Sequence, residues 1–329
     1  FLSFEKNTKI IIFAFNLFVR AHVKIYKENF SLPQDKKVIF TLGMFDGVHL
    51  GHQFVLKYLN QIAEKENGET AIMTFDPHPR FVLQPDTDFR LLTTLEEKTQ
   101  LLNSFSVQHL FVQKFTKEFS RLTALEFVRD ILVNQLNIHS LIVGYDHQFG
   151  RNRDGNFEQL QVFSEMFDFK LYQLPPISEH ETVVSSTKIR NRLEEGDIAT
   201  ANLWLGYTFM MKGKVVEGNK LGRQIGFPTA NLGIDPHKIC PKNGVYFVKV
   251  KIGEVFYNGM MNIGMRPTVN GIKKQIEVNI LDFDRDIYGK EIEVHFYERE
   301  REEQKFSSLE DLKKQLFLDR ENTREYFKE

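Results

Sequence analysis

Short apolar runs alternate with longer amphipathic stretches over the first half of the chain. The runs have the length of strands, and the stretches between them repeat apolar residues with helical spacing, as Leu125, Val128, Leu132 and Leu136 do. The pattern predicts strands at residues 38–42, 71–75, 109–112, 141–143 and 169–174, and helices at 51–65, 95–103 and 125–136. This alternation favours an α/β fold with a mainly parallel, doubly wound, Rossmann-like sheet, whose ligands bind at the carboxyl ends of the strands.

From residue 208 onward the pattern changes to strands separated by short turns. Val245, Phe247 and Lys249 alternate with their neighbours in the way that is typical of a small antiparallel β-barrel. The predicted strands are 209–216, 245–252, 255–261, 276–283 and 292–297, and an amphipathic helix follows at 308–318, with Ser307 and Glu310 as its capping box. We therefore expect one domain at residues 24–192, a helical connector at 193–207 and a second domain at 208–329.

Length, charge and cysteine content narrow the class of protein. The 329 residues suffice for two domains, each with its own core. A net charge of -1 gives no general attraction to nucleic acid or to an anionic membrane, so neither is expected as a partner. The single cysteine, Cys240, cannot form an intramolecular disulfide, which fits a reducing compartment and a cytoplasmic protein. The sequence does not indicate an oligomeric state.

The first residues have an apolar stretch at positions 10–19, interrupted by Asn16. This run is too short to span a bilayer, and no small-residue cleavage site follows it. We interpret residues 1–23 as a translated upstream stretch or an extra helix, in preference to a targeting signal.

A motif rich in glycine and histidine lies between the first predicted strand and the first predicted helix. It is Gly43-Met44-Phe45-Asp46-Gly47-Val48-His49-Leu50-Gly51-His52. A helix N-terminus presents unpaired N–H groups, which suit phosphate, and the glycines let the backbone approach a nucleotide closely. His49 and His52 can reach one triphosphate and stabilise charge at its α-phosphorus. The alternative is a pair of solvated or metal-binding histidines, but the strand–loop–helix context favours phosphate.

A second run of hydroxyl and basic residues begins a later predicted helix. It is Ser185-Ser186-Thr187-Lys188-Ile189-Arg190. Its hydroxyls, with Lys188 and Arg190, are suited to hold a pyrophosphate leaving group, although the same run would also serve as an ordinary helix N-cap. Taken with His49 and His52, the arrangement resembles the nucleotidyltransferase superfamily, which shares it with class I aminoacyl-tRNA synthetases.

Three further stretches resemble the adenylyltransferase module of bacterial FAD synthetases. They are Thr74-Phe75-Asp76-Pro77-His78-Pro79, Leu92-Thr93-Thr94 with Glu97-Lys98, and Val143-Gly144-Tyr145-Asp146-His147-Gln148-Phe149-Gly150. From the residues alone, the first is a proline-fixed turn and Asp146 a plain loop residue. The resemblance implies that these loops surround ATP and the flavin. At the ATP site it implies Gly43, Phe45, Asp46, Gly51, Asp146, Ser185, Ser186 and Thr187. This chain departs from the family at Met44 and at His147-Gln148, which affects substrate contacts more than the reaction.

The second half carries another glycine-rich motif. It is Gly218-Asn219-Lys220-Leu221-Gly222-Arg223-Gln224-Ile225-Gly226-Phe227-Pro228-Thr229-Ala230-Asn231. It is not a Walker A loop, because it lacks the Gly-Lys-Ser/Thr ending. Thr229 and Asn231 are two residues apart, so in an extended segment their oxygens face one side and suit Mg²⁺ that carries ATP phosphates. The alternative is a glycine hairpin in which the two side chains satisfy backbone groups, and the segment alone leaves both open.

The remainder of the second half resembles riboflavin kinase. The matching stretches are Gly244-Val245-Tyr246, Asn262-Ile263-Gly264, Arg266-Pro267-Thr268, Glu277-Val278-Asn279-Ile280-Leu281-Asp282-Phe283, Tyr288-Gly289 and Arg301-Glu302-Glu303-Gln304-Lys305-Phe306. With the first half, the chain resembles the bacterial bifunctional riboflavin kinase / FAD synthetase family from about residue 24 to its end.

This resemblance implies roles for individual residues. Glu277 would be the base that takes a proton from the riboflavin 5′-hydroxyl, and Arg301 would lie near the flavin. The nucleotide of the kinase would be bound by Gly218, Gly222, Arg223, Gly226, Pro228, Thr229 and Asn231. A strand carboxylate that faces a pocket is a suitable base, whereas the alternative for Glu277 is a solvent-facing strand charge. Asn279 stands where relatives often have His, and it cannot titrate.

The resemblance implies two consecutive reactions. Riboflavin and Mg-ATP give FMN and ADP in the barrel, and a second ATP then transfers AMP to FMN, giving FAD and pyrophosphate in the first domain. Mg²⁺ is the expected cofactor, and ATP and flavins are the expected small-molecule partners. Three alternatives remain: an enzyme with one of the two activities, a flavin- or nucleotide-binding regulator with a decayed site, and an RNA-linked adenylating enzyme. The balanced net charge and the lack of a basic tail argue against the last.

Overall fold

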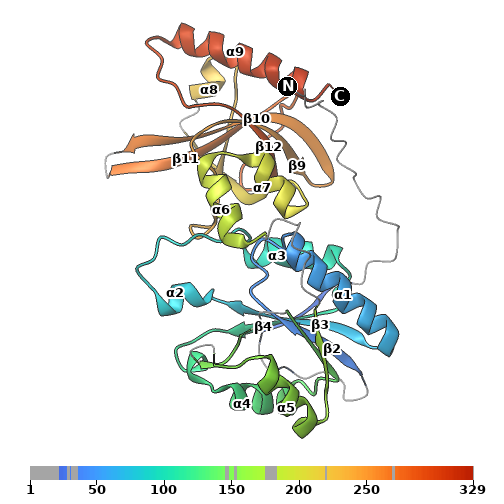
Figure 1. Cartoon of the computed structure of the whole chain (residues 1–329). Coiled ribbons are helices and arrows are strands. Elements are labelled where there is room, and N and C mark those ends of the chain that lie inside the picture. The colour runs from blue at the N-terminus through green and yellow to red at the C-terminus, as the bar shows by residue number, and fades with distance from the viewer. Residues whose placement is uncertain are drawn as a thin grey trace, which may run out of the picture.

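The computed structural model describes residues 22–27, 30, 36–144, 148–151, 154–174, 184–218, 221–268 and 271–328. The chain forms a sheet domain and a barrel domain, and two short helices stand between them (Figure 1). Asp146 and His147 lie outside the residues that the structure describes.

The sheet domain has six parallel strands in the order β1-β4-β3-β2-β5-β6. They are β1 (Lys24–Tyr26), β2 (Val38–Leu42), β3 (Glu69–Asp76), β4 (His109–Lys114), β5 (Ser140–Val143) and β6 (Lys170–Gln173). The helices are α1 (Leu50–Glu66), α2 (Pro79–Leu83), α3 (Leu95–Ser104), α4 (Ala124–Glu126), which continues as a π-helical stretch (Phe127–Gln135), and α5 (Phe157–Phe167). A single turn of 3-10 helix (Phe119–Arg121) precedes α4.

The central strands are apolar on both faces because helices cover both sides of the sheet. Phe40 packs in a cluster with Phe127 and Leu132, on the side of α4 and α5. The preceding residue of the strand, Ile39, points to the opposite face and packs with Leu56 of α1 and its neighbours. This arrangement confirms the prediction of a parallel, doubly wound sheet.

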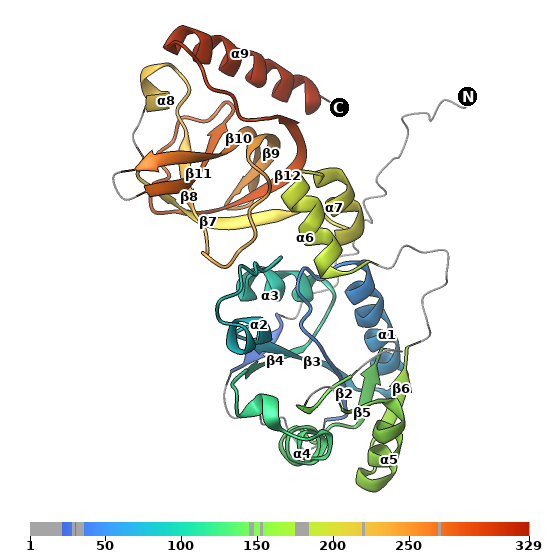
Figure 2. The ribbon, with the colours of Figure 1, turned by 60° about the vertical axis from the view of Figure 1, so that its left-hand side comes forward.

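Two helices, α6 (Ser186–Glu195) and α7 (Ile198–Leu205), connect the sheet to the barrel (Figure 2). The barrel is closed, with the strand order β10-β11-β8-β7-β12-β9, and the described neighbours pair antiparallel, as predicted. Its elements are β7 (Met210–Val216), α8 (Leu221–Gln224), β8 (Ala230–Gly233), β9 (Gly244–Ile252), β10 (Val255–Thr268), β11 (Gly271–Ile280), β12 (Glu291–Arg301) and α9 (Leu309–Tyr326).

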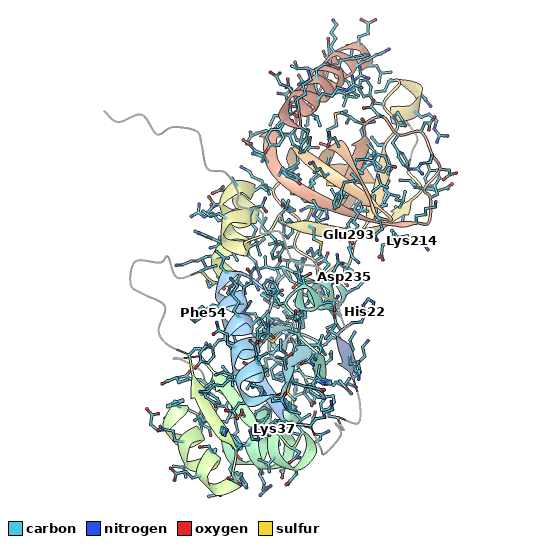
Figure 3. All side chains as sticks on the ribbon, turned by 90° about the vertical axis from the view of Figure 1, so that its right-hand side faces the viewer. His22, Lys37, Phe54, Lys214, Asp235 and Glu293 are labelled. Atoms are coloured by element: carbon cyan, nitrogen blue, oxygen red, sulfur yellow. The ribbon has the colours of Figure 1, made fainter. Side chains whose placement is uncertain are left out.

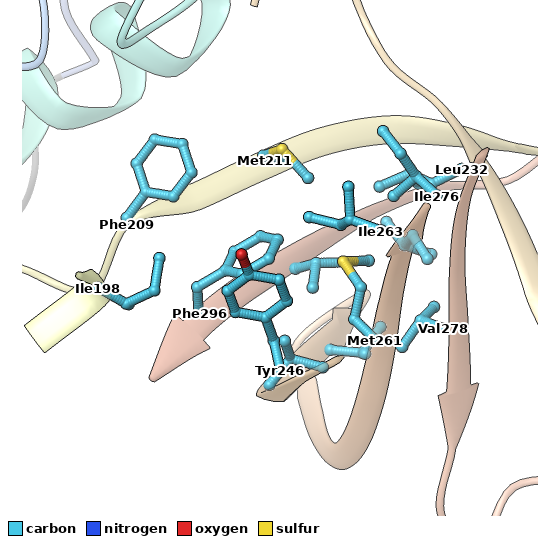
Figure 4. Packing of buried hydrophobic residues seen from close by; sticks show 14 of the residues in the cluster. Ile198, Phe209, Met211, Leu232, Tyr246, Met261, Ile263, Ile276, Val278 and Phe296 are labelled. Atoms are coloured by element: carbon cyan, nitrogen blue, oxygen red, sulfur yellow. The ribbon is translucent and has the colours of Figure 1, made fainter. Parts of the chain in front are cut away.

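Large apolar side chains fill the barrel. Tyr246, Phe296, Met261 and Val278 are fully buried and lie together inside the ring of strands (Figure 4). The same cluster continues into the connector through Ile198, so the barrel core and the connector are packed as one unit. Figure 3 shows Glu293 and Asp235 at the junction between barrel and sheet.

The predicted capping box of the last helix is wrong. The N-cap is Ser308, whose hydroxyl accepts a hydrogen bond from the amide of Asp311 at 3.1 Å, and Glu310 takes no part in it. The helix begins at Leu309, so Asp311 occupies the third helical position, where the partner of the cap has to stand. The helix also runs to Tyr326, beyond the predicted end at 318. Its last turns are held by polar contacts of the buried Asp319, which an apolar periodicity does not reveal.

Within the described residues, no helix has both the length and the apolar character needed to cross a membrane.

Candidate active sites

The first motif forms the loop between β2 and α1, as its spacing predicts. His49 is the N-cap of α1, and its Nδ1 accepts a hydrogen bond from the backbone amide of His52 at 3.4 Å. The two imidazole rings stack with their centroids 3.7 Å apart and an interplanar angle of 18°. Gly51 leaves room for this stack, because a Cβ there would lie 3.2 Å from Cε1 of His49.

Both imidazoles are neutral at neutral pH. Burial lowers the pKa of His49 to about 4, and the nearby Asp46 carboxylate only partly opposes this. Burial also holds the pKa of His52 well below its ordinary value, and His49 and Lys98 add to the effect. The Nδ1 atom of His52 is buried and has no hydrogen-bond partner among the described residues. The two side chains can therefore donate hydrogen bonds to a ligand without carrying charge.

Asp46 joins the first motif to Arg190 at the start of α6. Its carboxylate is buried and accepts a hydrogen bond from Nη2 of Arg190 at 2.6 Å. The same carboxylate accepts from the amides of Leu92 and Thr93 at 3.2 and 3.0 Å. The hydroxyl of Ser186 donates to the carbonyl of Asp46 at 2.9 Å. Segments more than a hundred residues apart in sequence thus meet at one carboxylate.

The guanidinium of Arg190 is fixed on two further sides. Its Nε donates to the carbonyl of Arg90 at 2.8 Å, and its Cζ lies 4.3 Å from the centroid of the Phe89 ring. Ser185 is the N-cap of α6 and accepts from the amide of Lys188 at 3.4 Å, while Thr187 is exposed on the first turn. Ser185 thus does act as an ordinary helix N-cap, as the alternative interpretation of this run expected. The same helix start also places Arg190 beside Asp46.

Lys98 is a buried cation in one of the stretches that resemble the adenylyltransferase module, but sequence reasoning assigned it no individual role. Its Nζ donates to the carbonyl of Met44 at 2.7 Å and to the hydroxyl of Thr74 at 3.0 Å. Burial lowers its pKa to about 8, although Asp46 and Asp76 favour the charged form. A lysine on an amphipathic helix normally indicates a solvated face, so the periodicity alone did not predict its burial, and only the family resemblance marked this position.

Among the cavities of the barrel domain, two meet at Thr229. The larger has a volume of about 480 Å³ and extends from the strands to α9, with Leu312 and Leu316 in its wall. The smaller, of about 300 Å³, is lined by Arg223, Pro228, Tyr288 and their neighbours. Thr229 lines both.

Glu277 lies in the wall of the larger cavity, half-buried. In the strand register it stands opposite Asn231 of β8 and Asn262 of β10. The side-chain amide of Gln275 donates to Oδ1 of Asn231 at 3.3 Å and also to Oε1 of Glu277. Sequence reasoning missed Gln275, although its position two residues before Glu277 puts both on one face of the strand.

Other residues of the glycine-rich motif shape the same region. Gly222 lies in α8, and a Cβ there would overlap the carbonyl oxygen of Phe227, so the segment requires glycine. Gly218 faces the side chain of Asn231, and Gly226 has a φ of +83°. Asn279 donates from Nδ2 to the carbonyl of Pro228 at 2.7 Å, which holds the end of the motif against β11.

Arg301, at the end of β12, also lines the larger cavity. Its Nε and Nη2 donate to the two carboxylate oxygens of Asp319 at 2.9 and 2.6 Å. Gln315 donates to the same carboxylate at 2.7 Å. A forked pair of this kind fixes the plane of the guanidinium, so α9 sets the orientation of Arg301 at the cavity.

Comparison with known proteins matches each half of the chain to a family. Residues 31–188 match the family described as FAD synthetase, and residues 205–327 match riboflavin kinase. The bifunctional riboflavin kinase/FMN adenylyltransferase of Escherichia coli (strain K12) is 38% identical over 300 residues, which cover 91% of this chain and 96% of that protein. The protein of the same description from Haemophilus influenzae is 40% identical over 289 residues, covering 87% and 93%.

A solved structure described as a macrolide-efflux protein from Streptococcus pneumoniae has the same two-domain fold. It is 33% identical, has a TM-score of 0.83, and the match covers 92% of this chain and 99% of that one. The relatives match the chain across both domains, and the two matched families correspond to the sheet domain and the barrel. The chain belongs to the family of bifunctional riboflavin kinase/FMN adenylyltransferases.

Proposed function

We propose that this enzyme makes FMN from riboflavin in the barrel and FAD from FMN in the sheet domain. The observation that carries the proposal is that one chain holds both sites. The stacked His49 and His52 lie at the start of α1 beside Arg190, and a separate pair of cavities meets at Thr229 next to Glu277. Both reactions consume ATP, and we further propose that the enzyme works in the cytoplasm.

The two cavities of the barrel suit two different ligands. The larger has apolar walls and the volume of a typical small-molecule site, which fits the flat ring system of riboflavin. The smaller, with Arg223 in its wall, would take ATP. Because Thr229 lines both, the 5′-hydroxyl of riboflavin and the γ-phosphate of ATP would meet beside it.

Mg²⁺ is the cofactor proposed for this step. Thr229 and Asn231 offer neutral oxygen ligands, and Mg²⁺ is normally bound by few protein oxygens together with substrate phosphates. The donor set therefore fits the ion. When bound, Mg²⁺ would neutralise charge on the phosphates of ATP.

Glu277 is proposed as the general base of the kinase step. The riboflavin 5′-oxygen attacks the γ-phosphorus, its proton passes to the Glu277 carboxylate, and ADP leaves. The side-chain amide of Gln275 donates to one carboxylate oxygen of Glu277 and so orients the proposed base. Arg301, held by Asp319, is proposed to face the flavin and its new phosphate. Positioned general-base help is typically worth about 10²–10⁴-fold in rate.

The loop before α1 is proposed to bind the second ATP. The helix N-terminus and the neutral imidazoles of His49 and His52 would donate hydrogen bonds to the triphosphate, with Gly43, Phe45 and Gly51 along its path. An oxygen of the FMN phosphate attacks the α-phosphorus, and pyrophosphate leaves toward Ser185, Ser186, Thr187 and Arg190. Asp146 is proposed at the same site from the resemblance alone. Charge stabilisation and positioning would do most of the work.

One assay tests both assignments. The purified protein is incubated with riboflavin and Mg-ATP, and riboflavin, FMN and FAD are separated and quantified. We expect the wild type to form FMN and then FAD. His52→Ala should stop at FMN, because His52 belongs only to the adenylyl site. Glu277→Gln keeps the size of the side chain and should fail to form FMN, while still converting supplied FMN to FAD.

Three results would contradict the proposal. A wild type that stops at FMN lacks the second activity. A His52→Ala variant that makes FAD at the native rate refutes the phosphate assignment of the first motif. A Glu277→Gln turnover number within a few-fold of wild type removes Glu277 from the kinase mechanism and returns it to the solvent-facing alternative.

A further inference from the structure

Residues 90–93 form a short strip that lies between the barrel and residues 43–49, the loop before α1, which we call the adenylyl loop. On the barrel side, Leu91 pairs with the loop that follows β8. Its amide donates to the carbonyl of His237 at 2.7 Å, and its carbonyl accepts from the amide of Ile239 at 2.8 Å. In Figure 2 this barrel loop reaches down toward α3 of the sheet domain. A single parallel β-bridge, between Leu91 and Lys238, thus joins the strip to the barrel loop.

On its other side the same strip holds the adenylyl site. The amides of Leu92 and Thr93 donate to the carboxylate of Asp46, and the carbonyl of Arg90 accepts from Arg190. Asp46 and Arg190 are themselves paired at 2.6 Å. Any shift of the strip relative to the barrel would therefore move both groups.

Lys238 of the barrel locks this strip in place. Its Nζ donates to the carbonyl of Leu92 at 2.6 Å and to Oε2 of Glu97 at 2.6 Å. The two charged side chains are 1% and 0% exposed. Glu97 also accepts from the amide of Lys212 in β7 at 3.0 Å, so the pair is tied to both domains. Burying two charges is costly, and such a pair gains its value from fixing one arrangement where an apolar pair would leave several.

The connector holds the loop from the opposite side. The hydroxyl of Tyr207 donates to the carbonyl of Gly47 at 2.6 Å. The amide of Gln53 donates to the carbonyls of Leu205 and Val48 at 2.7 and 3.0 Å. The adenylyl loop is therefore clamped between the connector and the strip that Lys238 fixes.

We propose that Lys238, a residue of the riboflavin kinase domain, is a positioning residue for adenylyl transfer in the other domain. It fixes the strip 90–93, the strip fixes Asp46 and Arg190, and these set the geometry around the triphosphate. The inference rests on the proposed function of that site. Misplacement of a catalytic group by about 1 Å can cost about 10²-fold in rate. A residue at the seam, the boundary between the barrel and the sheet domain, can therefore control turnover without touching substrate.

The test compares the two activities in Lys238→Met, which keeps the length of the side chain and removes its charge. We expect the turnover number for FMN adenylylation to fall at least tenfold, and riboflavin phosphorylation to stay within twofold of wild type. In the reverse reaction, the KM for pyrophosphate should rise, because Arg190 is displaced. A role confined to stability would not move this KM selectively.

Gln100→Ala is the matched control. Gln100 donates to Glu293 across the same boundary between barrel and sheet domain at 3.3 Å, and none of its hydrogen bonds within the described residues goes to the strip. Both activities of this variant should equal those of the wild type, which would separate loss of any seam contact from loss of the Lys238 contact.

A second variant keeps the proposal testable if Lys238→Met fails to fold, since that change leaves Glu97 buried without its cation. The double variant Lys238→Met/Glu97→Gln removes both charges together, and its folding is checked by circular dichroism. A folded variant that adenylylates FMN within twofold of wild type overturns the inference, and so does a folded double variant whose two activities fall in parallel. A wild type unable to adenylylate FMN would instead refute the proposed function.

Discussion

Acid should destabilise the ligand-free protein through His49. The imidazole is 6% exposed, and burial lowers its pKa to about 4, against about 6.5 in an unfolded chain. Between these two values the unfolded state binds a proton that the folded state does not. The free energy of unfolding therefore falls as the pH is lowered from about 6.5 to about 4, and this contribution changes no further below that.

The structure sets the size of this effect. A separation of about 2.5 pH units at about 1.4 kcal/mol each corresponds to about 3 kcal/mol for this one side chain. Such a loss is a large part of the net stability of an ordinary domain, which is about 5–15 kcal/mol. At neutral pH this loss of stability is almost absent, because the imidazole is then mostly neutral in both the folded and the unfolded state.

The measurement is denaturant unfolding at several pH values between 4 and 7.5, on the wild type and on His49→Gln, without nucleotide. Glutamine retains an acceptor for the amide of His52 but does not titrate. We expect the stability of the wild type to fall by about 3 kcal/mol more than that of the variant across this range. Two curves that run parallel within about 0.5 kcal/mol would show that His49 is not held neutral by burial, and the charge state assigned to the adenylyl site would be wrong.

Two further predictions concern the barrel. Asn231→Ala should abolish FMN formation but leave the conversion of supplied FMN to FAD intact, since Asn231 belongs to the proposed Mg-ATP site; loss of both activities in a folded variant would indicate one shared site. Asp319→Asn should weaken the forked pair that orients Arg301. The KM for riboflavin should then rise about tenfold or more, because Arg301 would lose its proposed hydrogen bond to the flavin, and a hydrogen bond to a charged group is worth about 1.5–3 kcal/mol. Steady-state kinase kinetics would check it, and an unchanged KM would argue against Arg301 at the flavin.

Periodicity located the elements that are apolar along their length. The strand at 38–42 coincides with β2, and the helix at 95–103 differs from α3 only by its last residue. It missed α5, in which only Leu160 is buried, and β1, which has three residues and is mostly exposed. It also missed the four-residue strand β8 and α8, which is a single turn inside a glycine-rich motif. The outer part of the β10–β11 hairpin was also missed, because the strands continue there into polar and glycine residues.

The sites were predictable where their residues are close in sequence. The spacing of His49 and His52 was enough to place both at a helix start. The contact of Asp46 with Arg190 spans 144 positions, so only the fold could reveal it. Lys238 was beyond sequence reasoning for another reason: lysine is rarely buried, and nothing local marks a lysine that finds its partners across a domain boundary.

The placement of the two sites indicates what joining the domains in one chain achieves. The larger barrel cavity is walled by α9 and reaches α8, and both helices lie on the end of the barrel remote from the sheet (Figures 1 and 2). The adenylyl loop lies at the other end, against α7 and against the strip 90–93, which the barrel loop that contains Lys238 holds. If the two sites are assigned as proposed, FMN formed in the barrel would have to leave its cavity before it is adenylylated. The direct link between the domains is structural: the barrel holds the strip 90–93, and the strip holds Asp46 and Arg190. On this reasoning the kinase domain supplies the second reaction with a scaffold as well as with its substrate.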